Sequence, residues 1–449
     1  MPTSNSRAPK ASSKINHMRR LSRPGSAGPR WRQALGAWAD KTPALLAATV
    51  LALLGACAVA PPAVGPARPA GPSPEASQAS EPPGPATPTV APAPPDAATL
   101  LRPRARWVPV DWSALPGWGQ DRAIELWPAL RAGCARPAPG WAAVCARVQG
   151  FSPPDDSFAR DFLQRELQPY RVESLDGETL GLATGYFEPL LLASRQRRPG
   201  FGVALHRPPA DLAQRKPYWT RQQLDTLPAA MAGLRGQEIA YLASALDLLV
   251  LQIQGSGRLR ITEADGRQRL VRVAYAGHND QPYKSVGRWL IDQGELKPDA
   301  ASWPAIRNWG ERAPPERLAQ MLWANPRVVF FREEALPDEA GAGAGSAAAA
   351  AAGPTGPRGA QGVPLDPGRS VAVDPLAVPY GTALWIDTTE PLSARPLQRL
   401  VMAQDTGSAI LGAVRVDYFW GSGEAAEQQA GRMKQALRLW ALWPRTAGP

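Results

Sequence analysis

The feature that most restricts the fold is the alternation of short apolar segments with glycine- and proline-rich turns over residues 370–443. The segments are rich in valine, leucine and alanine and too short for ordinary helices, so each is predicted to be a β-strand. They are Val371–Val373, Ala383–Ile386, Arg399–Ala403, Val414–Phe419 and Leu437–Ala441. Several short strands with turn signals between them are typical of a small β-barrel.

Upstream of these strands the sequence mixes helical and strand patterns. Pro128 lies inside a run with helical spacing and is expected to break or kink that helix. Asp155 is positioned to cap the next helix. The apolar run 238–251 is compatible with either helix or strand. Helices are predicted over residues 123–130, 155–167, 289–294, 303–311 and 315–324, and strands over 180–187 and 328–331.

The first 56 residues are expected to be a lipoprotein signal peptide. A basic region precedes an apolar run from Pro43 to Ala56, which is short for a membrane span and typical of a signal-peptide core. The run ends in Leu54-Gly55-Ala56-Cys57, which resembles a bacterial lipobox with Cys57 as the lipidated residue. An uncleaved anchor helix is the alternative.

The distribution of charge excludes a nucleic-acid partner. The leader holds nine basic side chains against one acid, a net charge of +8, so only +3 of the total +11 remains for the rest of the chain. A nucleic-acid interface would need a basic face that survives processing.

Two segments of low complexity interrupt the globular sequence. Residues 57–98 consist almost entirely of Pro, Ala, Gly, Ser and Thr, and account for many of the chain's 50 prolines. This composition buries no core and is predicted to form a tether. Residues 338–362 are mostly Ala and Gly and are interpreted as a loop insertion, with a short helix conceivable at 347–352.

The cysteines and histidines restrict the chemistry. Once Cys57 is lipidated, Cys134 and Cys145 remain, and such a pair in an exported protein is predicted to form a disulfide, with two reduced cysteines as the alternative. Of the three histidines, His17 lies in the leader and only His206 and His278 remain. A zinc site or a histidine-based triad is therefore poorly supported, and we expect no metal and no cofactor.

Three aspartates in the last third share a setting, because each lies at the end of an apolar strand beside turn residues or glycines. They are Asp374, Asp405 and Asp417. A carboxylate there is accessible to a ligand yet close to a dry interior, which raises its pKa and fits it to protonate a leaving group. A single aspartate of this kind usually caps a turn, so it is the shared setting that indicates a site.

These aspartate segments, at about residues 365–422, resemble the three-aspartate domain of bacterial cell-wall enzymes. Gln404-Asp405-Thr406-Gly407 is the most specific piece. Further matching motifs precede it in order: Leu115-Pro116-Gly117-Trp118, Thr184-Gly185-Tyr186-Phe187-Glu188-Pro189, Gln254-Gly255-Ser256-Gly257, Tyr275-Ala276-Gly277-His278-Asn279, Tyr283-Lys284-Ser285-Val286-Gly287 and Asn325-Pro326. Over about residues 107–443 the chain resembles the membrane-bound lytic murein transglycosylase A family.

The resemblance implies a mainly β fold, a double-psi β-barrel with a second, smaller β-domain inserted and a few short helices. The barrel would comprise residues 99–190 and 333–449, and the insert residues 191–332. The glycan would lie in a groove between the two.

The resemblance also implies the chemistry. Asp417 matches the catalytic residue, which would protonate the oxygen between MurNAc and GlcNAc and then accept the proton of the MurNAc C6 hydroxyl, leaving a 1,6-anhydro end. Asp405 and Asp374 would support the barrel turns and the charge of the site. Turn amides around Gly407 and Gly412 are expected to stabilise the charge that develops in the transition state.

Polar side chains beside the upstream glycines are candidates for glycan binding, with a purely structural role in strands and turns as the alternative. They are Thr184, Tyr186, Glu188, Gln254, Ser256 and Asn279. Hydroxyl and amide groups suit sugar hydroxyls, and a tyrosine ring can stack on a sugar ring.

Two other functions remain open on the sequence. A glycan hydrolase would use Asp374 or Asp405 as a second carboxylate, and a peptidoglycan-binding lipoprotein would keep the barrel without activity. The expected location is the periplasm, anchored to the outer membrane, because Ala58 rather than an aspartate follows Cys57. The expected partners are peptidoglycan glycan strands, the membrane through the lipid anchor, and proteins of cell-wall synthesis or the divisome.

Overall fold

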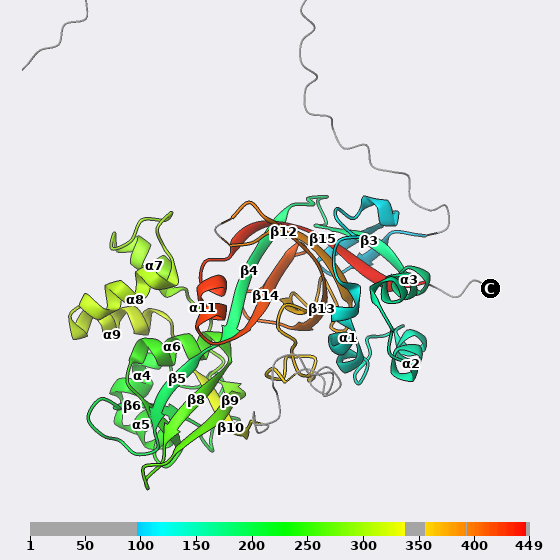
Figure 1. Ribbon diagram of the computed structural model, residues 1–449. Coiled ribbons are helices and arrows are strands. Elements are labelled where there is room, and N and C mark those ends of the chain that lie inside the picture. The colour runs from blue at the N-terminus through cyan, green and yellow to red at the C-terminus, as the bar shows by residue number, and fades with distance from the viewer. Residues whose placement is uncertain (1–96, 337–354, 392, 446–449) are drawn as a thin grey trace, which may run out of the picture. The chain divides into compact units, whose positions relative to one another are not determined.

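The computed structural model describes residues 97–336, 355–391 and 393–445 (Figure 1). The predicted leader, Cys57, residues 57–96 of the tether and residues 338–354 of the insertion lie outside these ranges. The strands are β1 Leu100–Arg102, β2 Ala105–Pro109, β3 Leu167–Glu173, β4 Gly181–Glu188, β5 Leu190–Ser194, β6 Val203–His206, β7 Glu238–Leu242, β8 Ser256–Thr262, β9 Gln268–His278, β10 Val329–Ala335, β11 Ser370–Val373, β12 Ala383–Thr389, β13 Pro396–Asp405, β14 Arg415–Ser422 and β15 Lys434–Pro444. The α-helices are α1 Trp127–Gly133, α2 Ala142–Gly150, α3 Asp156–Glu166, α4 Arg221–Thr226, α5 Pro228–Leu234, α6 Ala245–Gln254, α7 Val286–Asp292, α8 Trp303–Arg312, α9 Pro315–Ala324 and α11 Glu424–Ala430.

The larger sheet has nine strands in the order β1-β2-β3-β15-β12-β13-β11-β14-β4. The long strand β15 also pairs with β4, which closes β4, β14, β11, β13, β12 and β15 into a ring. In this ring β4 is parallel to β14 and β11 is parallel to β13, while the other four pairs are antiparallel. Closure removes the free edges that an open sheet would leave.

The alternation of side chains along the barrel strands explains why such short segments are stable. In β12, Leu384 and Ile386 point into the apolar interior of the ring, whereas Ala383 and Trp385 point outward and pack under α1, α2 and α3. Successive residues of a strand face opposite sides. Each strand of this part of the ring therefore contributes to two cores.

Two local signals in the helices on the outer face act as predicted, although the helix predicted over residues 123–130 is α1 at Trp127–Gly133. Residues 123–126 form a single 3-10 turn, and Pro128 lies in the first turn of α1, so the expected break is confirmed. Asp155 caps α3, since its carboxylate accepts the N–H of Phe158 at 2.8 Å. A disulfide joins Cys134 at the end of α1 to Cys145 in α2, with 5.1 Å between their Cα atoms.

The smaller sheet has six strands in the order β10-β9-β8-β5-β7-β6, all antiparallel neighbours except β5 and β8. The run 238–251, which the sequence left open, is divided between β7 and α6, with Ser244 capping the helix. The chain passes from the larger sheet to the smaller one at Pro189, between β4 and β5. The predicted mainly β fold, with a barrel-like sheet, a second β-sheet and short helices, is confirmed. The predicted domain limits remain a prediction.

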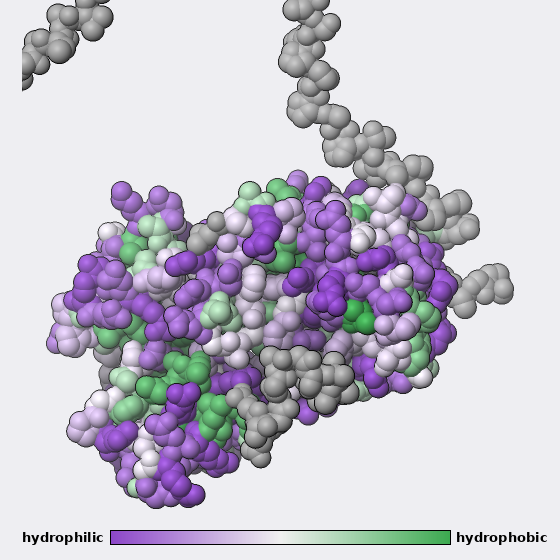
Figure 2. Space-filling view, in the orientation of Figure 1, coloured by the Kyte–Doolittle hydropathy of each residue, from purple (hydrophilic) through white to green (hydrophobic). Residues whose placement is uncertain are grey.

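Hydrophilic side chains cover most of the face shown in Figure 2, and an apolar area lies over the part of the chain that holds α6 and β5. Leu190 and Leu192, two large apolar side chains of β5, are 45% and 61% exposed.

A buried ionic cluster ties the end of β4 to the smaller sheet. The carboxylate of Glu188 is 1% exposed and accepts from Arg258 of β8 at 2.9 Å and from Arg272 of β9. Arg272 is itself buried and also donates to the carbonyl of Thr355 at 2.8 Å. Removing one member of such a cluster leaves its partner's charge uncompensated.

We therefore expect Glu188→Ala to lower the free energy of unfolding by about 3–5 kcal/mol, because the buried guanidinium of Arg272 loses its carboxylate. Urea denaturation followed by circular dichroism measures the change. The matched control is Glu390→Ala, whose partner Arg395 is 74% exposed, and there the change should stay below about 1 kcal/mol. Equal effects of the two substitutions would contradict a structural role for the Glu188 cluster.

Candidate active site

The site is built on the parallel pair β4 and β14, which lie side by side in Figure 1. Their register puts Thr184 opposite Asp417. Val416 and Tyr418 belong to the barrel interior, as does Ala183 of β4. Because side chains alternate along a strand, Thr184 and Asp417 are directed to the opposite face of the sheet.

The neighbouring strand β11 brings a second carboxylate to the same area. Ala372 pairs with Asp417 on one side and with Asp405 of β13 on the other. The two aspartates therefore flank β11, with their backbones two strand spacings, or about 9–10 Å, apart. The side chain of Ala372 forms an apolar floor together with Tyr186, Leu365, Ile410 and Phe419.

Among the described residues, one carboxylate oxygen of Asp417 accepts a hydrogen bond and the other has no partner. Its Oδ1 accepts the hydroxyl proton of Thr184, and among the described residues no donor contacts Oδ2. Burial raises the pKa of Asp417, whereas the hydrogen bond from Thr184 and the charge of Arg415 act in the opposite direction. The group is thus a carboxyl that holds a proton more readily than an ordinary aspartate.

Both oxygens of Asp405 are engaged. Oδ1 accepts the N–H of Ala360 at 2.9 Å, and Oδ2 accepts the hydroxyl of Tyr186 at 3.1 Å. Burial raises the pKa of Asp405 to about 6; hydrogen bonds from Thr406, Ala360 and Tyr186 oppose the rise, and the nearby charge of Asp417 adds to it. The two carboxylates therefore influence each other's ionisation.

The carboxylate of Asp374 stabilises the turn that follows β11. Its side chain is 1% exposed, and its oxygens accept from Arg104 at 3.0 Å and from the N–H groups of Leu376 and Gly412 at 3.0 and 2.9 Å. The predicted role of Gly412 needs correction, because its amide is bonded to Asp374 and is not available to developing charge on a substrate. Gly412 has φ +117°, which explains the glycine at this position.

The structure brings together only part of the predicted glycan-binding set. Thr184 and Tyr186 contact the two aspartates, and Gln254 lies next to them, since its Oε1 accepts the N–H of Phe187 at 2.9 Å. Ser256 opens β8 and is 8% exposed.

Two members of that set have other roles. Asn279 is fully buried, donates to the carbonyls of Trp219 and Pro326, and accepts the N–H of Val328. Glu188 is committed to the ionic cluster described above. Neither offers a polar atom to a sugar, so both leave the candidate set.

The sequence reading missed Arg415 and the structural use of Gln404. Arg415 donates to the hydroxyl of Thr184 at 2.8 Å. It lies two residues before Asp417, so strand periodicity could have placed both on one face. Gln404 is fully buried; it accepts from Ser370 and donates to the carbonyl of Ala129, which fastens α1 to the barrel.

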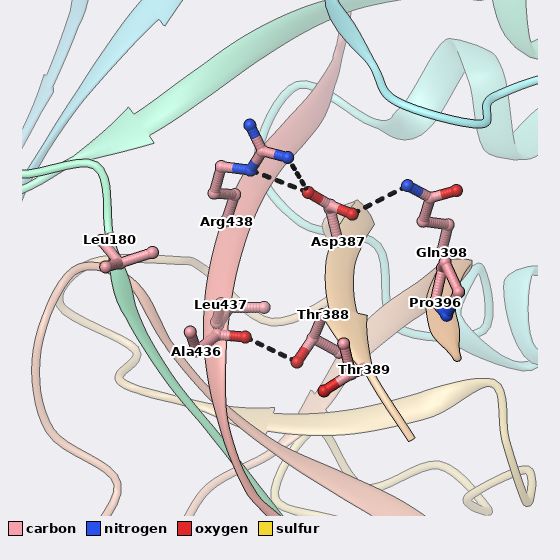
Figure 3. Close-up of a pocket in the computed structure, with 9 residues that line it drawn as sticks. All are labelled: Leu180, Asp387, Thr388, Thr389, Pro396, Gln398, Ala436, Leu437 and Arg438. Atoms are coloured by element: carbon pink, nitrogen blue, oxygen red, sulfur yellow. Dashed lines mark hydrogen bonds and ion pairs between the residues drawn. The ribbon is translucent and has the colours of Figure 1, made fainter. Parts of the chain in front are cut away.

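A separate cavity of about 250 Å³ lies where strands β12, β13 and β15 meet (Figure 3). Its polar groups bond to one another: Asp387 accepts from Arg438 and Gln398, and Thr388 donates to the carbonyl of Ala436. It contains none of the predicted site residues, and we do not assign the active site to it.

Within residues 97–336, 355–391 and 393–445, no three His, Cys, Asp or Glu side chains are grouped so that they could hold a metal ion. No helix in those ranges has both the length and the apolar character needed to cross a membrane.

Comparison with known proteins gives two matches to family models, the MltA specific insert domain over residues 182–332 and the 3D domain over residues 369–443. The membrane-bound lytic murein transglycosylase A of Escherichia coli K12 is 30% identical over 290 residues, 63% of this chain and 71% of the relative.

Two solved structures are also similar. The lytic transglycosylase LtgG of Burkholderia pseudomallei is 41% identical, with a TM-score of 0.51, and the match covers 80% of this chain and 99% of that one. E. coli MltA with bound chitohexaose is 27% identical, with a TM-score of 0.58 over 78% and 94% of the two chains. The chain therefore belongs to the membrane-bound lytic murein transglycosylase A family.

Proposed function

We propose that the protein cleaves the β-1,4 bond between MurNAc and GlcNAc in peptidoglycan by lytic transglycosylation, with Asp417 as its only acid and base. The observation that supports this most directly is the difference between the aspartates. Asp374 and Asp405 have both oxygens bonded inside the protein, whereas Oδ2 of Asp417 is free among the described residues.

The proposed reaction needs one carboxyl group and no water. Protonated Asp417 gives its proton to the glycosidic oxygen as the bond from that oxygen to C1 of MurNAc breaks. The C6 hydroxyl of the same sugar then attacks C1, and its proton goes to the ionised Asp417. One C–O bond is broken and one is formed, and the carboxyl ends as it began. Attack from within the sugar has a high effective concentration.

The substrate class is supported by the family and by the E. coli relative solved with chitohexaose, a β-1,4-linked glycan. On this chain we assign sugar contacts to Thr184, Tyr186, Gln254 and Ser256. Thr184 and Tyr186 bond to Asp417 and Asp405, Gln254 bonds to the backbone of β4, and Ser256 begins β8, which contacts β4. Tyr186 is largely buried and packs on Phe419, with 5.1 Å between ring centroids, so little of its surface is available to a sugar.

For the location, we propose a lipoprotein anchored to the outer membrane through Cys57. The support is the lipobox-like sequence at its position behind a basic and apolar leader. The E. coli relative is named membrane-bound.

A two-carboxylate hydrolase is the second candidate, because Asp405 lies on the other side of β11 from Asp417. Such an enzyme would add a water molecule to each cleaved bond. Against it stands the engagement of both Asp405 oxygens by Ala360 and Tyr186.

We expect Asp417→Asn to lower the rate of glycan release from purified murein by about 10²–10⁴-fold, because the amide cannot supply the proton. The matched control is Asp387→Asn, an aspartate of the same barrel that bonds to Arg438 in the separate cavity, and it should keep the parent rate. An active Asp417→Asn enzyme would refute the assignment.

The activity should also depend on pH in a defined direction. Only protonated Asp417 can act as the acid, so kcat/KM should fall as the pH rises through the raised pKa of that group. Asp405→Asn removes a carboxylate whose two oxygens are already bonded to Ala360 and Tyr186, and it leaves Asp417 in place. The variant should therefore stay active and keep a fall in kcat/KM at rising pH. Complete loss of activity in Asp405→Asn would favour the hydrolase.

A further inference from the structure

Arg415 is a charged side chain of the site that the proposed reaction does not use. It lies on β14, two residues before Asp417 and on the same face. One guanidinium nitrogen donates to Oγ1 of Thr184 at 2.8 Å, and the other donates to the carbonyl oxygens of Val416 and Leu182. The guanidinium is thus fixed between the backbones of β4 and β14.

This contact determines where the hydroxyl of Thr184 points. A threonine hydroxyl has one proton to donate and lone pairs that accept. Because Arg415 has only donors, it can contact Oγ1 only at a lone pair. The single hydroxyl proton then goes to Oδ1 of Asp417. With Oδ1 occupied as an acceptor, a proton carried by Asp417 must be on Oδ2, the oxygen that is free for a substrate.

We infer that Arg415 is a positioning residue that acts through Thr184: it orients the threonine hydroxyl toward Oδ1 of Asp417 and so reserves Oδ2 for the transferable proton. The inference rests on the proposed function of Asp417. It adds a residue that touches neither the substrate nor the reacting atoms.

Arg415 also acts on Asp417 through its charge. A positive charge nearby favours the carboxylate, so Arg415 lowers the pKa of Asp417 against the opposing effect of burial. Other ionisable groups on the elements packed around Asp417 are Tyr186 of β4, Asp405 of β13, Asp374 after β11, Lys434 of β15 opposite Thr184, and Glu424 and Glu427 of α11. Two of these carboxylates are paired with other arginines, Asp374 with Arg104 and Glu427 with Arg307. Arg415 is linked to Asp417 through the hydroxyl of Thr184.

The test is a double-mutant cycle with Arg415→Met and Thr184→Val in the full-length enzyme, acting on purified glycan strands. Arg415→Met should lower kcat by about tenfold, which corresponds to the loss of one hydrogen bond to a charged group. In the Thr184→Val background the same substitution should change kcat by less than about twofold, because the residue through which it acts is gone; kcat is compared at low pH, where Asp417 is protonated in every variant and the charge of Arg415 has no effect on the protonated fraction. Independent, multiplying effects would overturn the inference.

The pH dependence of kcat/KM distinguishes this role from a purely structural one, because a purely structural residue would not shift it. Removal of the positive charge raises the pKa of Asp417, so Asp417 stays protonated to higher pH and the fall in kcat/KM should move upward in Arg415→Met. Arg415→Lys keeps the charge and should keep the profile near that of the parent. The matched control, Arg438→Met, removes an arginine of β15 that pairs with Asp387 in the separate cavity (Figure 3), and should move neither kcat nor the profile.

Arg415 also bonds to two backbone carbonyls, so folding is checked by thermal unfolding. If Arg415→Met does not fold, Arg415→Gln, whose amide can still donate to a carbonyl, takes its place in the cycle. An unchanged kcat and an unchanged pH profile in folded variants would refute the role of Arg415 while leaving Asp417 in place. Activity of Asp417→Asn would instead refute the proposed function itself, so the two failures are distinguishable.

Discussion

The pairing of β4 with β14 is the contact on which the rest of the structure depends. It brings together Thr184 and Asp417, which are 233 residues apart in the chain. The same strand β4 pairs with β15 on its other side and so closes the barrel. Its last residue, Glu188, enters the ionic cluster with the smaller sheet. A single strand therefore completes the barrel, supplies the hydroxyl that donates to Asp417 and leads into the second sheet.

The proposed chemistry rests on a difference in hydrogen bonding among the three aspartates. Asp374 is bonded to an arginine and two backbone amides and serves a turn, and Asp405 is held by Ala360 and Tyr186. Of these three aspartates, only Asp417 combines burial with an oxygen that has no partner in the described part of the chain. Burial favours the protonated form of Asp417, and the oxygen without a partner, Oδ2, is the one that can carry the proton toward a substrate. Both properties are needed in a group that must give a proton and then take one back.

Much of the fold could be predicted from the sequence because its signals are local. Asp155 caps the helix that begins at the next residue, and Pro128 marks a helix start, so neighbouring residues suffice to predict both. The site was predictable only in part. Asn279 and Glu188 lie in motifs with polar residues and glycines, which is why they were predicted to bind the glycan. Their hydrogen-bond partners come from distant segments, and the sequence alone does not show that these segments meet. Arg415 was missed because a charged residue beside an apolar strand is usually a solvated side chain, and only the register of β4 shows that it meets Thr184.

The central claim is that one carboxyl group cleaves the glycan without water. Digestion of purified sacculi in water labelled with heavy oxygen, followed by mass spectrometry of the released muropeptides, tests it most directly. Cleavage by Asp417 alone predicts products with 1,6-anhydro ends, lighter by one water molecule than hydrolysis products and free of the label. Reducing ends that carry the heavy oxygen would contradict it.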